Sequence, residues 1–274
     1  MLILTAIVNF FVVFVFFGLL GNNAGPAFLY SLIIIVALAW LATTELAEKF
    51  FRFTHGMRRP IKREVDYLLP VLEELCRRAG IEKVPTLCVA DDPMPNAYAL
   101  GKNTVCVTRG LLKTATEEEI RGVIAHEIGH LKYGHSKRAL IAHTLNQVGN
   151  VASIILVFFA STLAAASSQE QERRGSGVSF IAIFVALFLK LGLWAFQRAI
   201  DLGFLAIGRK EEYQADAYAV QLGVGEGLLS FLEKIADSDF QTKGFWARLE
   251  ATHPPVMLRI EKVEEAITKG RETA

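Results

Sequence analysis

The sequence predicts a mainly α-helical membrane protein with about four hydrophobic helices and one cytoplasmic domain that contains a small antiparallel sheet. Composition supports the membrane part, because 52% of the 274 residues are hydrophobic and only 21% are charged. Ordinary soluble proteins have a smaller apolar excess. The hydrophobic residues are concentrated in blocks, each close to the roughly 20 apolar residues that a membrane-spanning helix needs. Short β-type runs between the blocks predict the sheet.

The first two blocks, at about 2–20 and 27–43, are joined by a short uncharged turn. No basic segment precedes the first block and no clear small-residue cleavage site follows it. A retained helical hairpin is therefore favoured over a signal peptide. We expect the N-terminal hairpin to occupy residues 1–44.

Two further blocks lie at about 145–166 and 178–199, on either side of a polar loop. Lys190 and Arg198 interrupt the second block, so buried helices of the polar domain remain the alternative to membrane spans. If this pair is one unit, the chain divides into four parts. They are the hairpin at 1–44, a first polar part at 45–144, the helix pair at 145–200 and a second polar part at 201–274.

Basic residues after the second block indicate the orientation. The loop before that block carries no charge, whereas six basic residues follow it: Lys49, Arg52, Arg58, Arg59, Lys62 and Arg63. The polar parts should therefore face the cytoplasm, in a multi-pass protein of the inner (plasma) membrane. The net charge of +1 gives no sign of a nucleic-acid partner, and the basic run suits anionic lipid headgroups of the bilayer. Three widely spaced cysteines fit a reducing compartment.

Three extended runs, at about 86–90, 97–100 and 104–108, form the expected antiparallel sheet. The segment Asn96, Ala97, Tyr98 and Ala99 is a candidate edge that could bind an extended peptide by adding it to the sheet. An ordinary structural hairpin explains the same residues equally well.

The segment 117–135 holds His126, Glu127 and His130 in an H-E-x-x-H arrangement. Side chains four residues apart share one face of a helix, so both imidazoles can bind one zinc ion. Glu127 can then take a proton from a zinc-activated water, which is the chemistry of peptide hydrolysis. Thr116 and Glu119 predict a capping box at the start of this helix. The alternative is a coincidental pair of packed or solvated histidines.

A catalytic zinc site needs a third protein ligand and groups that orient the ligands. Glu212 and Asp216 are the best candidates, since they also lie four apart on a predicted helix. Glu212 can bind the metal and Asp216 can accept the other ring N–H of a ligand histidine. The alternative is a solvated acidic turn. His135 and His143 fit surface or packing histidines better than ligands.

With these residues in place, the chain resembles the HtpX family of membrane zinc metalloproteases, gluzincins related to the CAAX prenyl proteases. The resemblance covers nearly the whole chain and includes the late Thr252-His253-Pro254-Pro255. It implies a zincin-like cytoplasmic domain with one Zn²⁺ per chain on His126, His130 and Glu212. One departure is Tyr98, where N-A-F is common in the family.

The resemblance also implies the activity. We expect a zinc endopeptidase that degrades damaged membrane proteins, with Glu127 as general base, Asp216 behind a ligand histidine and peptide along the 96–99 strand. His253 would bind the oxyanion or simply begin a helix. Other membrane quality-control proteases are expected partners. A prenyl-peptide processing enzyme, a catalytically silent zinc-binding scaffold and a transporter are the competing interpretations.

Overall fold

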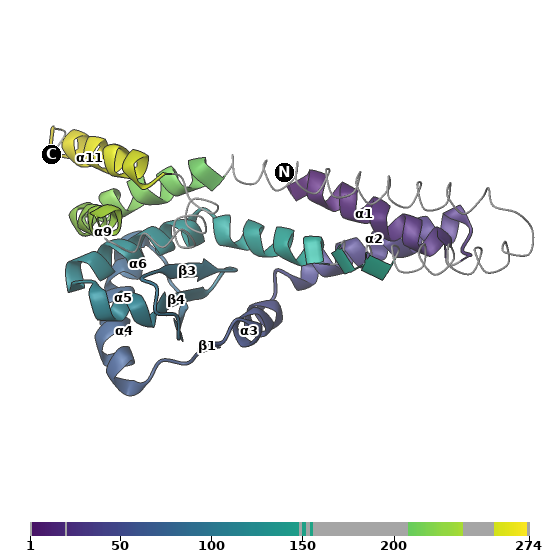
Figure 1. Cartoon of the computed structure of the whole chain (residues 1–274), viewed down its shortest axis with the longest axis horizontal. Coiled ribbons are helices and arrows are strands. Elements are labelled where there is room, and N and C mark those ends of the chain that lie inside the picture. The colour runs from purple at the N-terminus through teal and green to yellow at the C-terminus, as the bar shows by residue number, and fades with distance from the viewer. Residues whose placement is uncertain are drawn as a thin grey trace, which may run out of the picture. The chain divides into compact units, whose positions relative to one another are not determined.

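The computed structural model describes residues 2–19, 21–147, 150–151, 154–155, 208–237 and 255–272, drawn in colour in Figure 1. The chain divides into two compact units. One comprises Met1–Trp40 and Ile141–Phe204, and the other comprises Leu41–Leu140 and Leu205–Ala274. The larger part of the third predicted block, all of the fourth and the interrupting Lys190 and Arg198 lie outside the described residues.

The first unit begins with two apolar helices, α1 (Leu2–Leu19) and α2 (Ala24–Leu41), which match the predicted hairpin blocks. They contact each other through aromatic rings, with the centroids of Phe10 and Phe28 5.1 Å apart. Helix α2 is long and apolar enough to cross a membrane, and only 17% of it is buried, unlike the core helix of a soluble protein. The apolar part of α1, Leu2–Gly18, is slightly shorter. Among the described helices, α2 is thus the candidate membrane span.

The second unit is built on a four-stranded sheet in the order β1-β2-β4-β3. Its strands are β1 (Met57–Arg58), β2 (Thr86–Ala90), β3 (Ala97–Leu100) and β4 (Thr104–Thr108). The sheet is mixed, so the prediction of an antiparallel sheet was wrong. Strands β3 and β4 form an antiparallel hairpin, but β2 lies on the far side of β4 and pairs with it in parallel. Sequence spacing identified the strands but could not give their order.

The turn between β3 and β4 is fixed by a helix. Gly101 has a φ of +60°, which favours glycine, and a side chain there would collide with the carboxylate of Glu48. Glu48 belongs to α3 (Glu45–Thr54) and accepts hydrogen bonds from Lys102 N (2.7 Å) and Thr104 Oγ1 (2.8 Å). This buried carboxylate therefore attaches α3 to the end of the hairpin.

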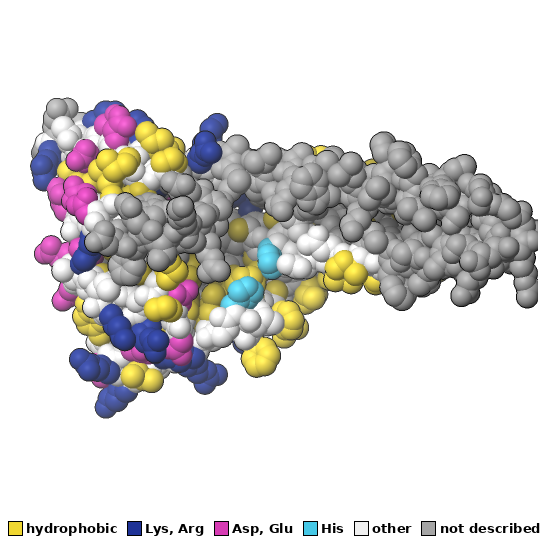
Figure 2. Space-filling view, in the orientation of Figure 1, with side chains coloured by type: hydrophobic (Ala, Val, Ile, Leu, Met, Phe, Trp, Pro, Cys, Tyr) yellow, Lys and Arg dark blue, Asp and Glu magenta, His cyan; other side chains and the backbone are white. Residues whose placement is uncertain are grey.

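The remaining described helices of this unit are α4 (Lys62–Ala79), α5 (Arg109–Thr114), α6 (Glu117–Lys132), helical residues 135–140 and 208–221, α9 (Gly225–Asp237) and α11 (Val256–Glu272). Figure 1 shows α6 next to β3 and α9, and these elements are in contact. Leucines of α4, the inner residues of β2 and β4, and Ile120, Ile124 and Ile128 of α6 form one core. The face in Figure 2 shows basic and acidic side chains interspersed over the described part of this unit.

Two glycines allow α6 and α9 to touch. A Cβ at Gly122 would lie 2.1 Å from the backbone N of Leu228, and a Cβ at Gly227 would lie 2.0 Å from the carbonyl O of Glu118. Larger residues would force the helices apart, because real Cβ atoms do not approach backbone atoms so closely. The close approach fixes α6, which carries the H-E-x-x-H residues, against the core.

Candidate metal centre

Helix α6 begins with the capping box that the sequence predicts. Thr116 Oγ1 accepts a hydrogen bond from Glu119 N (3.2 Å), and a Glu119 carboxylate oxygen accepts one from Thr116 N (2.8 Å). Glu119 also accepts hydrogen bonds from Ser230 (3.0 Å) and Lys234 (2.9 Å) of α9. The free backbone N–H groups at the helix start are therefore hydrogen-bonded locally. Glu119 also links this end of α6 to α9.

Three potential metal ligands converge between α6 and residues 208–221. The Nε2 atoms of His126 and His130 are 3.1 Å apart. Glu212 places one carboxylate oxygen 3.2 Å from His130 Nε2 and the other 3.4 Å from His126 Nε2. Ligands bonded at about 2.0–2.1 Å to a tetrahedral ion lie roughly 3.3 Å from one another. The separations, measured to either oxygen of Glu212, are close to that spacing, and one ligand atom from each of the three residues lies within 4.8 Å of the others.

The donor types also fit a metal. Two imidazole nitrogens and one carboxylate oxygen are a ligand set that borderline divalent ions accept in catalytic sites. His126 and Glu212 are buried and His130 is half-buried, so an ion would be shielded from most solvent on the protein side. The residues therefore form a candidate metal site.

His126 is supported by a buried ion pair. Its Nδ1–H donates to Asp216 Oδ1 at 2.8 Å, so Asp216 occupies the predicted position behind a ligand histidine. Arg259 of α11 donates to the same carboxylate through Nε (2.9 Å) and Nη2 (2.7 Å). Asp216 and Arg259 are only 1% and 6% exposed. Such an arrangement fixes the ring and leaves Nε2 directed at the metal position.

Charges around His126 dominate its protonation. Burial lowers the pKa of His126, but the carboxylates of Asp216 and Glu212 outweigh it and raise the pKa to about 10. Burial likewise raises the pKa of Asp216, and the positive charges of Arg259 and His126 lower it to about 2. Histidine binds a metal in its neutral form, so protons and a metal ion would compete for this ring.

His130 is supported by a neutral chain instead. Its Nδ1 lies 3.0 Å from His135 Nδ1, and His135 Nε2 lies 3.2 Å from Gln214 Oε1. Since the amide oxygen only accepts, His135 donates from Nε2 and accepts the Nδ1–H of His130. Burial is the main cause that lowers the pKa of His135, which favours this neutral form. His135 thus lies behind the candidate ligand His130 and holds its ring through Nδ1.

Close packing brings the two ligand-bearing helices together. A Cβ at Gly129, inside the H-E-x-x-H segment, would lie 3.1 Å from the Cα of Ala215. Ala215 is fully buried and lies between Glu212 and Asp216 in sequence. Small residues at both positions allow the approach that joins the ligands.

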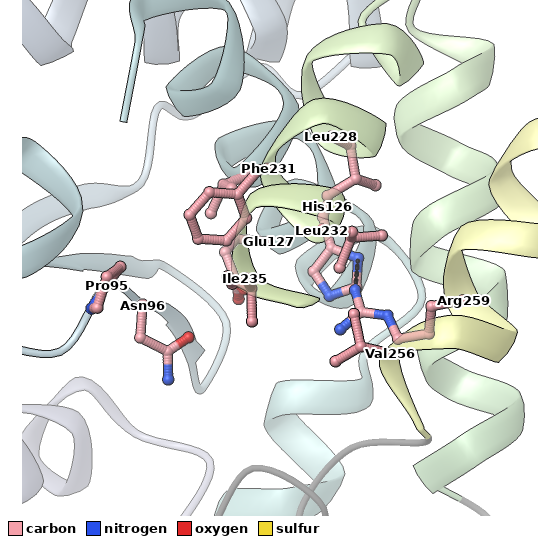
Figure 3. Close-up of a pocket in the computed structure, with 11 residues that line it drawn as sticks. Pro95, Asn96, His126, Glu127, Leu228, Phe231, Leu232, Ile235, Val256 and Arg259 are labelled. Carbon is pink, nitrogen blue, oxygen red and sulfur yellow. Dashed lines mark hydrogen bonds between the residues drawn. The ribbon is translucent and has the colours of Figure 1, made fainter. Parts of the chain in front are cut away.

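Glu127 lies at a pocket beside the metal position. Figure 3 shows Glu127 and His126 on the wall of this pocket, with Asn96 and Pro95 on another side and apolar side chains between. The apolar lining comes from α6, α9 and α11 and consists of Val123, Leu228, Phe231, Leu232, Ile235 and Val256. The Glu127 carboxylate can accept and donate protons next to the candidate metal site. The apolar pocket can hold a side chain of a bound ligand beside it.

The predicted edge segment is indeed at an edge. Within the part of the chain that the structure describes, β3 is last in the sheet order and pairs only with β4. Asn96 lines the pocket, and its backbone exchanges hydrogen bonds with Thr108. Ala97 is buried, while Tyr98 and Ala99 are half-buried. Burial raises the pKa of Tyr98, so its hydroxyl stays neutral.

The structure does not place two further histidines at this centre, one because it is not described and the other because it lies in the first unit. His253 lies outside the described residues, as do its neighbours Thr252 and Pro254. His143 is on helical residues 135–147 but belongs to the first unit.

Sequence reasoning missed Arg259 and Gln214. Arg259 had a usable signal, because it lies within the apolar stripe Val256, Ile260, Val263 and Ile267 of α11. A cation at such a position needs a buried partner. Gln214 had no comparable signal, since it follows the ligand Glu212 by two residues and looks like a surface residue.

Comparison with known proteins agrees with this centre. Residues 62–267 match the family model described as peptidase family M48. A "Protease HtpX homolog" from Dictyoglomus thermophilum is 36% identical over 76% of this chain and 72% of the relative. Another from Caldanaerobacter subterraneus subsp. tengcongensis is 30% identical over 96% of this chain and 90% of the relative.

A solved structure shares the fold. The crystal structure of S. mikatae Ste24p aligns with a TM-score of 0.54 at 20% identity over 93% of this chain, which spans 62% of that structure. A metal site of two histidines and a glutamate, a family model over most of the chain and these relatives agree: the chain is a metalloprotease that belongs to peptidase family M48, among the proteases named HtpX homologs.

Proposed function

We propose that the chain is a zinc-dependent endopeptidase with Zn²⁺ on His126, His130 and Glu212 and with Glu127 as general base. One observation carries the proposal. The Nε2 atoms of His126 and His130 lie 3.1 Å apart, and each has an oxygen of the Glu212 carboxylate within 3.4 Å. Glu127, on the same helix as the histidines, lines an adjoining pocket. Two imidazoles with one glutamate form a known catalytic zinc set.

Zinc bound there would polarise the scissile carbonyl and lower the pKa of a water to roughly 7. Glu127 takes the proton of that attacking water and passes it to the leaving amine. Because Glu127 directly follows His126 on α6, its carboxylate is held beside the ligands. Asp216 and His135 keep the ligand rings oriented during the reaction.

The edge of β3 supports a binding mode for the peptide. An extended substrate would add to β3 along Asn96, Ala97, Tyr98 and Ala99, with backbone hydrogen bonds to the edge. Asn96 lines the same pocket as Glu127, so a peptide on this edge passes the proton-transfer group (Figure 3). The apolar lining from α9 favours an apolar substrate side chain next to the cleaved bond.

The substrate class follows from the candidate span. Helix α2 would hold the protein in the inner membrane, and the basic residues that follow it favour a cytoplasmic catalytic domain. Polypeptides that fail to assemble in that bilayer are then the nearest substrates. Other membrane quality-control proteases are proposed partners in the same task.

The test compares the full chain with Glu127→Gln in detergent, with zinc and a loosely folded protein substrate. Loss of a general base should lower cleavage about 10²- to 10⁴-fold. Zinc content should stay near one ion per chain, because Glu127 is not among the ligands.

Glu118→Gln is the matched control, since Glu118 is exposed on the same helix and should leave cleavage unchanged. Glu212→Ala should lose both zinc and activity. Full activity of Glu127→Gln would disprove the assignment of the base, and normal zinc content of Glu212→Ala would disprove the ligand set.

A further inference from the structure

Helix α3 has one face that belongs to the folded domain and one that does not. Glu48 is 4% exposed and bonds to the β3–β4 turn, as described above. Leu46, Phe50 and Phe53 are by contrast 64%, 68% and 83% exposed. Exposing two phenylalanines and a leucine to water on a ten-residue helix is unfavourable.

The exposed residues form a single stripe. Leu46, Phe50 and Phe53 are spaced by four and three residues, so they lie on one face of the helix. At about 100° per residue, Glu48 is roughly 200° away from Leu46 around the axis. The helix therefore binds its own domain with one side and presents an apolar stripe on the opposite side.

The position of α3 in the chain limits what can cover this stripe. Helix α2, the candidate span, ends at Leu41, and α3 begins at Glu45. Three intervening residues cover at most roughly 14 Å even when extended, which keeps the start of α3 near the end of α2. Trp40, in the last turn of α2, is 69% exposed, and tryptophan favours the membrane–water interface.

Charge around the stripe favours the same environment. Lys49 is exposed next to the stripe, and Arg59, Lys62 and Arg63 are exposed shortly after the helix. Their long side chains can extend to phosphate groups while apolar neighbours lie deeper. The acidic Glu45 at the helix start is paired with Lys83 at 3.2 Å. Apolar stripes flanked by basic residues are typical of helices that lie in the interfacial plane.

We propose that Leu46, Phe50 and Phe53 insert into the headgroup–acyl boundary of the bilayer that α2 crosses. Helix α3 thereby provides a second membrane contact besides α2. Its Glu48 side binds the protease domain, and its apolar stripe binds the membrane. The inference rests on the membrane part of the proposed function, not on its chemistry, because α3 contributes no residue to the metal centre or its pocket.

The test places an environment-sensitive NBD label on single introduced cysteines in the full chain. Phe50→Cys and Phe53→Cys report on the stripe. Val36→Cys labels an exposed position of the candidate span α2, and Lys113→Cys labels an exposed position of α5 away from the stripe. The native cysteines are at most 3% exposed, so the unmutated chain serves as a labelling blank. The proteins are reconstituted in vesicles of phosphatidylcholine and phosphatidylglycerol. Quenching is compared for nitroxide lipids in the membrane and iodide in the water.

Labels at positions 50 and 53 should be quenched several times more strongly by nitroxide lipids than the label at 113, and more weakly by iodide. If Val36→Cys responds to the lipids but positions 50 and 53 behave like 113, the stripe faces water and the proposal fails. It also fails if 50 and 53 are shielded from both quenchers, because protein then covers the stripe. A Val36 label without lipid quenching would remove α2 as a span and the proposal with it. The Glu127→Gln assay is unaffected by these outcomes, so the two proposals fail separately.

Discussion

His126 and His130 stand four residues apart on one helix, yet their Nδ1 atoms have different partners. One partner is charged and the other is neutral. His126 donates to a carboxylate that is paired with a buried guanidinium. His130 meets a neutral histidine that is fixed by an amide. The same local motif is thus stabilised by a distant charged pair on one side and by neutral hydrogen bonds on the other.

The difference has consequences for stability. Asp216 and Arg259 lie almost entirely away from solvent, so neither can lose its partner without leaving a buried charge. His135 and Gln214 carry no charge, and the ring of His130 is itself more exposed than that of His126, at 13% against 5%. We therefore expect the His126 side to couple metal binding to folding, and the His130 side to affect mainly ring orientation.

The largest effect should follow Asp216→Ala. Arg259 loses its bidentate partner and keeps longer contacts to Glu212 at 3.4 Å and to His126 Nδ1 at 3.5 Å. Removing one partner of a buried ion pair costs about 3–5 kcal/mol, and losing the support of a ligand histidine lowers metal affinity about 10- to 100-fold. Thermal unfolding and zinc titration measure the two losses.

A matched control and a double variant sharpen this prediction. Glu211→Ala removes a solvent-accessible partner of Arg138 from the same helical segment and should cost at most about 1 kcal/mol. Asp216→Leu combined with Arg259→Met should recover much of the stability but not the zinc affinity. Equal stability of Asp216→Ala and Glu211→Ala would contradict the role of the buried pair.

A smaller loss of stability is expected for His135→Ala, because no charge is left unpaired. Zinc affinity should still fall about 10- to 100-fold, since the ring of His130 loses the acceptor at Nδ1. His55→Ala, which changes an exposed histidine on the same unit, is the control. Competition with a chelator gives the affinity. Unchanged affinity would mean that His135 does not orient His130.

The smallest effect is expected for Glu119→Gln. This substitution weakens the capping of the first turn of α6, which lies N-terminal to both histidines. Burial raises the pKa of Glu119, but hydrogen bonds from Lys234, Thr116 and Ser230 outweigh it and hold the pKa below the usual 4.5. The charged form therefore stabilises the fold by about 1 kcal/mol above pH 4.5. This advantage over Glu119→Gln should shrink as the pH falls through the folded pKa.

Urea unfolding at pH 7 and at pH 3.5 tests that sign. Zinc affinity at pH 7 should hardly change, because neither ligand ring loses its partner. A stability difference that grows toward low pH would contradict the prediction.

The sequence by itself determined the parts that are local. The H-E-x-x-H spacing on a capped helix, the three longer strands and the apolar blocks depend on residues close together in the chain, where helical and strand periodicity suffices. The third ligand Glu212 and its neighbour Asp216 could be proposed because zinc chemistry demands a further ligand. The structure then brings both to the histidines.

Tertiary structure alone decided the rest. The parallel pairing of β2 with β4 depends on strand order, which spacing does not encode. Arg259 reaches Asp216 across 43 residues, and His135 meets Gln214 across 79. Such contacts arise only when helices pack at a distance set by glycines such as Gly129. Local pattern identifies the ligands of a metal, whereas packing chooses the side chains that hold those ligands in place.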